Sequence, residues 1–421
     1  MELELRIDRL GAQGDGVAQG PEGQGPEGRG PEGPLFVPYA LPGERVRVAV
    51  EAGQSHGRLV AVLDPSPDRV LPICPHFGIC GGCALQHLEE GAYLAWKRDQ
   101  VGAALASRGL DVSIEPVRSV KLASRRRATF ALARAPSGAV LGYHWRGSHD
   151  IFDVEACPVL VPQLEASLPK LKAALAGLAP AKGQARVSVT VSDAGLDVAV
   201  EDVSAALGAG RRASLAQASM AAGVARLTLD GEVVMQRAAP SLTLSGAHIV
   251  PPPGAFLQAS GAAEQILVEL VGEGVGRAKR VADLFAGLGP FTLALAKGAA
   301  VDAFEQDADA LAALAVAARA TPKLKPVRVH VRDLFRTPLT TKELAAYGAL
   351  VLDPPRAGAR AQATELAASS VAKIVAVSCN PGTLARDLRI LVDGGYRITR
   401  VVPVDQFRFS PHIEVVAYLE R

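Results

Sequence analysis

The second half of the chain alternates short apolar strands with helical segments, and this alternation limits the fold more than any other feature. From about residue 250, the strand VADLF precedes the turn AGLG and the helical segment PFTLALAKGA, and the strand AVDAFEQ precedes DADALAALAVAARA. The strands VRVHVRD, ALVLDPP and KIVAVSCN follow, and YRITRVVPVD and HIEVVAYLE form a closing hairpin. This pattern predicts a doubly wound, mostly parallel α/β sheet of the Rossmann-like type, ending in an antiparallel pair. Ligands of such sheets bind outside the carboxyl ends of the strands.

The preceding part of the chain has another pattern, and 421 residues leave room for two or three domains. Residues 1–62 alternate apolar and polar side chains between glycines and prolines, which predicts a small all-β domain. Within it, residues 20–34 carry a tandem Gly-Pro-Glu-Gly repeat, which we expect to form an extended, mobile loop. Residues 63–250 combine a cysteine-bearing loop, a helix over 91–109 and several strands, which predicts a central α+β domain. The α/β domain then covers residues 251–421.

Charge and composition exclude several classes of protein. The net charge of +2 is too small for a histone-like basic protein. The N-terminal segment MELELRIDRL is too charged for a signal peptide, and no run of 18 apolar residues suggests a membrane span. We therefore expect a cytoplasmic enzyme that acts as a monomer.

Polar and glycine residues follow three successive strands of the predicted α/β sheet. Gly287 and Gly289 lie in the turn after the first strand, where a missing Cβ lets a ligand approach the backbone closely. Glu305 ends the second strand and suits the two hydroxyls of a ribose, and Asp333 ends the third strand and could meet an adenine edge. The spacing is not the GxGxxG of dinucleotide sites. Together these residues indicate an adenosine pocket without a phosphate, which suits S-adenosyl-L-methionine.

The order of these motifs resembles that of class I methyltransferases. DLFAGLG is similar to the first motif of that class, FEQ to its ribose-binding strand end, and LDPPR at residues 352–356 to its fourth motif. Amine N-methyltransferases usually place an aromatic residue where this chain has Arg356. The arginine therefore argues against amine methylation, and a zinc-stabilised amine methyltransferase is the weaker alternative.

A thiol and a carboxylate near the end of the chain narrow the resemblance to RNA uracil-5-methyltransferases. VSCNP places Cys379 at the end of an apolar strand after the DPPR strand, and PHIEVVAYLE contains Glu414. Carbon 5 of uracil is a poor nucleophile until a thiolate adds to carbon 6, and cysteine is both a good nucleophile and a good leaving group. A base must then remove the hydrogen from carbon 5. We expect Cys379 to be the nucleophile and Glu414 the base.

The resemblance also implies further contacts to the methyl donor or the uracil. PGAFLQAS at residues 253–260 is similar to the family motif whose glutamine, here Gln258, contacts the methyl donor. By the same resemblance, Phe285 and Asp353 line the site together with Glu305 and Asp333. The family often has asparagine after the glycine turn, whereas this chain has Pro290. Proline lacks an N–H donor but suits the first turn of a helix.

The other four cysteines have the spacing of a metal cluster. CPHFGICGGC contains Cys74, Cys80 and Cys83, and Cys157 follows far downstream in VEACPVL. Four thiolates bind either tetrahedral zinc or a [4Fe–4S] cluster, and free thiols are the third alternative. Three clustered cysteines and one distant one favour iron–sulfur, and the cluster-bearing branch of the resembled family has this pattern. We expect a [4Fe–4S] cluster with a structural role.

RNA is the partner that these features predict. GDGVAQ and LFVPYALPGERVRVAV make residues 1–62 similar to a TRAM domain, a small oligonucleotide-binding β-barrel. Arg125, Arg126 and Arg127 are either phosphate contacts or a solvated charged edge. Because a TRAM domain together with a cluster resembles the 23S rRNA enzymes, rRNA is the preferred substrate and tRNA the alternative. A non-catalytic iron–sulfur RNA-binding factor is the rival from another class.

Overall fold

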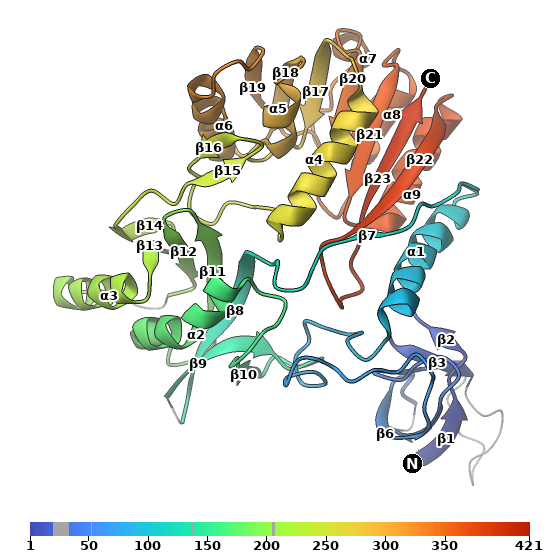
Figure 1. Ribbon diagram of the computed structural model, residues 1–421, viewed down its shortest axis with the longest axis vertical. Helices are drawn as coiled ribbons and strands as arrows, with labels where there is room; N and C mark the ends of the chain where they lie inside the picture. The colour runs from blue at the N-terminus through green and yellow to red at the C-terminus, as the bar shows by residue number, and fades with distance from the viewer. Residues whose placement is uncertain (20–32, 52, 137, 204–206) are drawn as a thin grey trace. The chain divides into compact units, whose positions relative to one another are not determined.

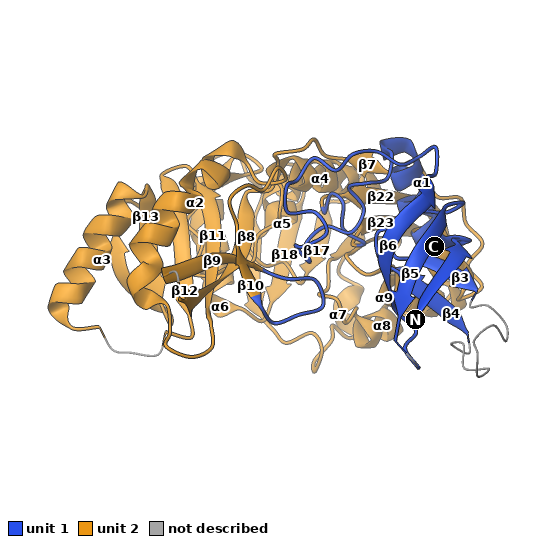
Figure 2. Ribbon diagram, turned by 90° about the horizontal axis from the view of Figure 1, so that it is seen from below, with its two compact units in different colours: residues 1–100, 144–150, 407–411 blue, residues 101–143, 151–406, 412–421 orange. Residues whose placement is uncertain are grey.

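The computed structural model describes residues 1–19, 33–51, 53–136, 138–203 and 207–421. Residues 20–32, which hold most of the Gly-Pro-Glu-Gly repeat, lie outside the described residues, so the expected loop is not addressed. The chain divides into two compact units (Figure 2). Unit 1 comprises Met1–Gln100, His144–Asp150 and Phe407–Pro411, and unit 2 comprises Val101–Tyr143, Ile151–Gln406 and His412–Arg421. Within the described ranges, every helix is too short or too polar to cross a membrane.

Unit 1 contains two small antiparallel sheets. One has the order β1-β5-β6 and the other the order β2-β3-β4. Alternate side chains of these strands, such as Val46 and Val48, are fully buried in a common apolar cluster, as period-2 alternation predicts. The strand bounds are β1 Glu2–Arg6, β2 Arg9–Leu10, β3 Gly16–Gln19, β4 Pro34–Val37, β5 Arg45–Val50 and β6 Gly57–Asp64. A loop without regular strands then leads to α1 (Glu90–Ala106), the helix that the sequence predicts over 91–109.

The first part of unit 2 is a seven-stranded sheet with two helices. Its order is β10-β9-β8-β11-β12-β13-β14, and all pairs with printed registers are antiparallel except the parallel pair β12–β13. One apolar cluster joins this sheet to α2 (Pro162–Leu175) and α3 (Ala209–Ala221). The strands are β8 Arg127–Ala135, β9 Gly138–His144, β10 Ile151–Asp153, β11 Ala185–Ser192, β12 Gly195–Glu201, β13 Val224–Leu229 and β14 Glu232–Gln236. The four strands predicted for the central region are β8, β9, β11 and β12. A short helix, η1 (Ala176–Leu178), follows α2, and the hairpin of β15 (Leu242–Leu244) and β16 (Ala247–Ile249) follows β14.

The second part of unit 2 is the sheet predicted from the strand–helix alternation. Its order is β19-β18-β17-β20-β21-β23-β22-β7 (Figure 1). Strands β17 to β21 pair in parallel, whereas β23 is antiparallel to both β21 and β22. The strands are β17 Arg280–Leu284, β18 Ala300–Glu305, β19 Val327–Val331, β20 Ala349–Leu352, β21 Lys373–Ser378, β22 Arg397–Asp405 and β23 Glu414–Glu420. The edge strand β7 (Arg118–Ser119), which the sequence pattern does not reveal, pairs in parallel with β22.

Helices cover both faces of this sheet, so a central strand such as β20 is apolar and buried along its whole length. Neighbouring residues of one strand face opposite sides: Val351 joins an apolar cluster with α4, and Leu350 and Leu352 join a cluster with α8 and α9. The carboxyl ends of the parallel strands lie at one edge of the sheet, and the residues expected to bind a ligand are found there. The helices are α4 Gly261–Val275, α5 Pro290–Leu295, α6 Ala308–Ala320, α7 Thr341–Leu344, α8 Arg360–Ala367 and α9 Pro381–Asp393.

Candidate active site

The glycine turn after β17 adopts a backbone that most residues avoid. Phe285, Gly287 and Gly289 have φ angles of 63°, 53° and 75°. A Cβ on Gly289 would lie 2.5 Å from Leu314 Cδ1, so glycine is needed there for space as well as conformation. Pro290 opens α5, as expected from its fixed φ. The strained Phe285 is typical of a turn shaped for a ligand.

Glu305 at the end of β18 holds this turn in place. Its Oε2 accepts a hydrogen bond from the Gly287 N–H at 3.1 Å, and its Oε1 accepts from the N–H groups of Gln306 and Asp307 at 2.7 and 3.0 Å. A carboxylate oxygen has two lone pairs, so Oε2, which accepts one hydrogen bond here, retains acceptor capacity, whereas Oε1 already accepts two. The geometry gives Glu305 a role in orienting the glycine turn, and the expected ribose contact remains a prediction.

Asp283, which the sequence interpretation did not single out, lies buried beneath the turn. Its Oδ2 accepts a hydrogen bond from Thr292 Oγ1 at 2.5 Å, whereas Oδ1 has no partner among the described residues. Burial raises the pKa of Asp283 to about 7, against the opposing effect of the Thr292 hydrogen bonds. A buried acceptor without a protein partner calls for a donor from outside the described residues, and its place beneath the turn makes Asp283 a candidate for ligand contact.

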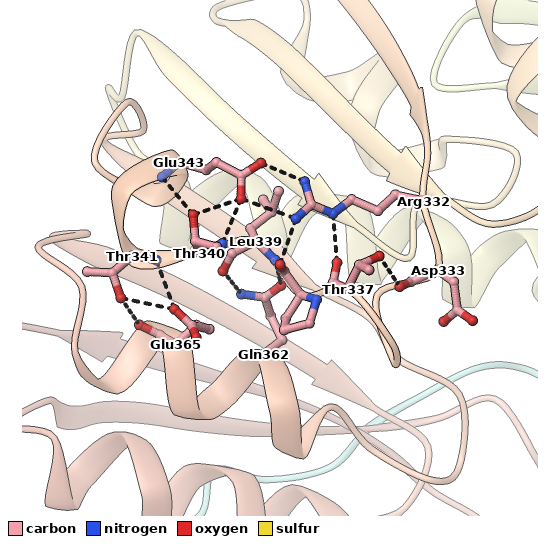
Figure 3. Close-up of polar contacts among 10 residues, drawn as sticks. Arg332, Asp333, Thr337, Leu339, Thr340, Thr341, Glu343, Gln362 and Glu365 are labelled. Carbon is pink, nitrogen blue, oxygen red and sulfur yellow. Dashed lines mark hydrogen bonds and ion pairs between the residues drawn. The ribbon is translucent and has the colours of Figure 1, made fainter.

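Asp333 lies after β19 on a segment that is firmly held. Arg332 pairs with Glu343 through two hydrogen bonds of 2.6 and 3.1 Å, and Gln362 bonds both backbone groups of Leu339 (Figure 3). Asp333 Oδ1 accepts from the backbone N–H groups of Phe335 and Arg336, and Figure 3 shows its carboxylate pointing away from the Glu343 cluster. The expected adenine contact remains a prediction.

Three of the side chains predicted from the sequence lie where β20, β21 and β23 end or begin. Asp353 follows β20, Cys379 follows β21, and Glu414 opens β23. Asn380 caps α9, because its Oδ1 accepts from the N–H groups of Gly382 and Thr383, and this bond orients the backbone beside the thiol.

These groups perturb one another's protonation. Burial, together with the charges of Glu414 and Asp353, raises the pKa of Cys379 to about 11, and Arg356 acts in the opposite direction. Burial and the charge of Glu414 raise the pKa of Asp353 well above its usual value. Burial raises the pKa of Glu414 to about 7, partly offset by hydrogen bonding to Gln406 and by Arg356. Clusters of such shifted groups are typical of catalytic sites.

Gln406 connects the carboxylate to the expected cofactor ligand. Its Nε2 donates to Glu414 Oε1 at 2.9 Å and to Gln258 Oε1 at 2.7 Å. All three side chains are buried. The structure therefore brings together Gln258 and Glu414, which lie 156 positions apart in the chain, through a residue that no sequence motif indicated.

Two arginines of the run at residues 125–127, Arg126 and Arg127, make contacts within the fold. Arg126 forms an ion pair of 2.7 Å with Glu264 of α4, and the two side chains are 15% and 8% exposed. Arg127 stacks over the ring of Phe256 at 5.4 Å, and burial lowers its pKa. At Arg126 both alternatives are wrong, because the guanidinium is committed to a buried carboxylate.

The four remaining cysteines carry no disulfide and are all half-buried. Cys74, Cys80 and Cys83 lie in the loop of unit 1 between β6 and α1, where Gly82 N–H donates to Cys80 Sγ at 3.3 Å. Cys157 belongs to unit 2, and its N–H donates to Glu165 Oε1 at 2.8 Å. Within the described part of the chain, no three His, Cys, Asp or Glu residues form a group that could hold a metal ion.

Comparison with known proteins places this site in a family. The family model for tRNA (uracil-5-)-methyltransferases matches residues 251–421. The chain is 46% identical to an RNA methyltransferase of Brucella melitensis, over 99% of this chain and 98% of that protein. It is 34% identical to the 23S rRNA (uracil(1939)-C(5))-methyltransferase of Chromohalobacter salexigens, over 99% and 89%.

A solved structure shares the fold of the whole chain. The tRNA (uracil-54, C5)-methyltransferase of Pyrococcus abyssi, in complex with S-adenosyl-L-homocysteine, matches with a TM-score of 0.73 and 23% identity over 99% of both chains. Together with the relatives above, the strand-end residues identify the chain as an enzyme. It is a member of the S-adenosylmethionine-dependent RNA (uracil-5-)-methyltransferase family.

Proposed function

We propose that this enzyme methylates carbon 5 of a uridine in 23S rRNA, with Cys379 as nucleophile and Glu414 as base. One observation carries the proposal: β21 and β23 pair antiparallel with Ser378 opposite Val415, so the thiol that follows β21 and the carboxylate that opens β23 come next at the same end of this strand pair. A nucleophile and a base acting on adjacent ring carbons must lie beside each other in this way.

The side chains divide the reaction between them. As a thiolate, Cys379 adds to carbon 6, and the displaced electron pair makes carbon 5 enolate-like, so that carbon 5 can take the methyl group. A protonated Asp353 is able to donate a hydrogen bond to an oxygen of that enolate-like ring. Glu414 then accepts the proton from carbon 5, and the ring expels the Cys379 thiolate. S-adenosylmethionine supplies the methyl group, and Gln258, Phe285, Gly287, Gly289, Glu305 and Asp333 are the residues that we propose to hold it.

The reaction steps above require the Cys379 side chain to be a thiolate, so the protonation state of this thiol matters. With a pKa of about 11, Cys379 is a thiol rather than a thiolate at neutral pH in the ligand-free site. A neighbouring positive charge lowers the pKa of a thiol, and Arg356 already acts in this direction. Cys379 must therefore lose its proton before it adds to carbon 6, and the charge of Arg356 favours that loss.

The substrate assignment rests on the relative from Chromohalobacter, whose name specifies 23S rRNA. The name of the Pyrococcus neighbour specifies tRNA, so tRNA is the alternative. Residues 1–62 and 63–250 are proposed as a TRAM-like RNA-binding barrel and a central domain in front of the catalytic domain at 251–421.

Methyl transfer to defined RNAs tests the function and the substrate together. The full-length protein, labelled S-adenosylmethionine and either 23S rRNA or tRNA lacking modifications are incubated, and the nucleosides are separated by mass spectrometry. We expect 5-methyluridine in 23S rRNA and little in tRNA. Label in a methylated amine, or equal transfer to both RNAs, contradicts the respective part of the proposal.

We also propose that Cys74, Cys80, Cys83 and Cys157 bind a [4Fe–4S] cluster. Their spacing supports this proposal and none of them is used in a disulfide, whereas the described residues form no assembled metal group. Protein purified without oxygen should be brown and contain about four irons per chain. Cys83→Ser should lose the iron, and Cys379→Ala should retain it. Stoichiometric zinc in a colourless protein would overturn the assignment.

A further inference from the structure

Gln406 occupies a position that neither the sequence motifs nor the proposed chemistry uses. It follows the last residue of β22, and its side chain is 3% exposed. Its amide nitrogen has two hydrogens, and both find buried acceptors: Gln258 Oε1 at 2.7 Å and Glu414 Oε1 at 2.9 Å. Its own Oε1 is buried and has no partner among the described residues.

The two acceptors determine which way the amide points. With the amide reversed, Gln406 Oε1 would face the oxygens of Gln258 and Glu414, and two hydrogen bonds would become repulsive oxygen–oxygen contacts. The observed orientation leaves Oε1 without a partner, which costs free energy in a buried site. The two hydrogen bonds that Nε2 donates therefore fix the orientation of the Gln406 side chain, despite the cost of the unpartnered oxygen.

We propose that Gln406 is a positioning residue that keeps Glu414 charged and directed as the base and fixes the amide of Gln258. The N–H donor favours the carboxylate over the neutral acid, because only the charged form gains a full charge-assisted hydrogen bond. Gln258 uses its oxygen toward Gln406, so its amide nitrogen is the group that it presents to a ligand. The inference rests on the proposed function only in naming Glu414 as the base.

The surroundings of Glu414 explain why such a donor matters. Asp353 after β20 and Cys379 after β21 are acidic groups whose protonation responds to the charge of Glu414. Arg356, also after β20, is the cation that favours its charged form. Arg356 is exposed, and its Nη2 forms a hydrogen bond with His412 Nε2 at 3.1 Å. The buried donor that contacts the carboxylate directly is therefore Gln406.

Gln406→Met tests the inference, because methionine keeps the length of the side chain and removes both N–H donors. Without the donor, the pKa of Glu414 rises. Because the base acts without its proton, the rate falls with decreasing pH, and this acid limb should move upward by about one pH unit. At a pH below the acid limbs of both proteins, Gln406→Met should then methylate RNA about tenfold more slowly than the wild type. Well above both limbs, the two rates should be nearly equal. Gln406→Glu should move the limb further, because a carboxylate beside Glu414 disfavours its charge.

Gln362→Met is the matched control. Gln362 is equally buried and also makes two amide hydrogen bonds, but both join it to the backbone of Leu339 and neither involves Glu414 (Figure 3). It should lower thermal stability without moving the acid limb. A purely structural role for Gln406 predicts the same behaviour in Gln406→Met, and an unmoved limb in both Gln406 variants overturns the inference.

A second measurement separates this inference from the proposed function. Infrared difference titration of the ligand-free protein, with Glu414→Gln as the blank, follows the carboxyl of Glu414 without any turnover. The carboxyl should titrate near neutral pH in the wild type and about one unit higher in Gln406→Met. Equal titration in both proteins overturns the inference whatever RNA is methylated, whereas absence of 5-methyluridine with a shifted titration overturns only the proposed function.

Discussion

Cys379→Ala should abolish methylation of uracil in RNA, with a loss of at least about 10⁴-fold in the rate of product formation. Without addition at carbon 6, carbon 5 has no electron pair with which to take the methyl group, so no slower route through the same site remains. Binding should survive, because the glycine turn is held by the Glu305 carboxylate, which the substitution leaves in place. Single-turnover assays with labelled methyl donor measure the first effect, and calorimetric titration with S-adenosylhomocysteine measures the second.

Two variants calibrate this result. Cys379→Ser keeps the size of the side chain but replaces the thiol with a poor nucleophile, and it should be as inactive as the alanine variant. Ser378→Ala removes the neighbouring hydroxyl, which donates to the Asn380 carbonyl at 3.2 Å, and should retain most activity. Substantial activity in Cys379→Ala would refute the carbon 5 mechanism for this protein.

The sheet and its ligand-binding edge were predictable because they depend on local patterns. Apolar strands alternating with helices specify a covered parallel sheet, and the carboxyl ends of parallel strands meet at one edge. Glu305 ends such a strand, and Gly287, Asp353 and Cys379 follow one, so their convergence could be inferred from the strand pattern alone. The closing hairpin of β22 and β23 is buried over most of its length, and its pairing with β21 brings Glu414 to the same edge.

The residues that the sequence did not reveal act through contacts between distant parts of the chain. Gln406 has no motif of its own and acquires a role only when β22 places it between Gln258 and Glu414. Arg126 is part of a charge run, but its partner Glu264 lies 138 positions later on α4. A charge run shows which residues carry charge but does not show which carboxylate they meet in the fold.

Asp283 illustrates a third reason. It precedes the glycine turn within DLFAGLG, and an acidic residue in an apolar strand is an evident signal. The glycines of the turn predict a close approach of a ligand to the backbone. The sequence does not show that Asp283 is buried, or that its Oδ1 lacks a partner among the described residues. The cysteines show the reverse: their spacing is informative in the sequence, while the described residues add no assembled site to it.

Glu414→Gln should fail in a different way from Cys379→Ala, because it blocks the reaction after methyl transfer. Glutamine keeps the shape of the side chain and an oxygen that accepts from Gln406 Nε2, so the arrangement with Gln258 should persist. Cys379 still adds, and the methyl group still moves to carbon 5, but the remaining hydrogen leaves slowly without a base. Turnover should fall by about 10² to 10⁴-fold.

The blocked step should leave a visible product. Enzyme and methylated RNA should accumulate as a covalent adduct that resists denaturing gel electrophoresis and approaches one RNA per chain. Gln406→Met should produce a weaker version of the same adduct at low pH, where Glu414 carries a proton. Gln362→Met, the control for a lost buried amide, should produce none beyond the wild-type amount.

The double variant Cys379→Ala with Glu414→Gln decides between two interpretations of any trapped species. If the bond joins Cys379 to carbon 6, the double variant cannot form it, and a surviving adduct would mean that another residue is the nucleophile. If Glu414→Gln loses activity and forms no adduct while RNA binding is intact, the carboxylate is needed before methyl transfer. In that case Asp353, the other carboxyl group near the thiol with a strongly raised pKa, becomes the group to replace next as the candidate base. Its replacement by asparagine would then be expected to trap the adduct that Glu414→Gln did not.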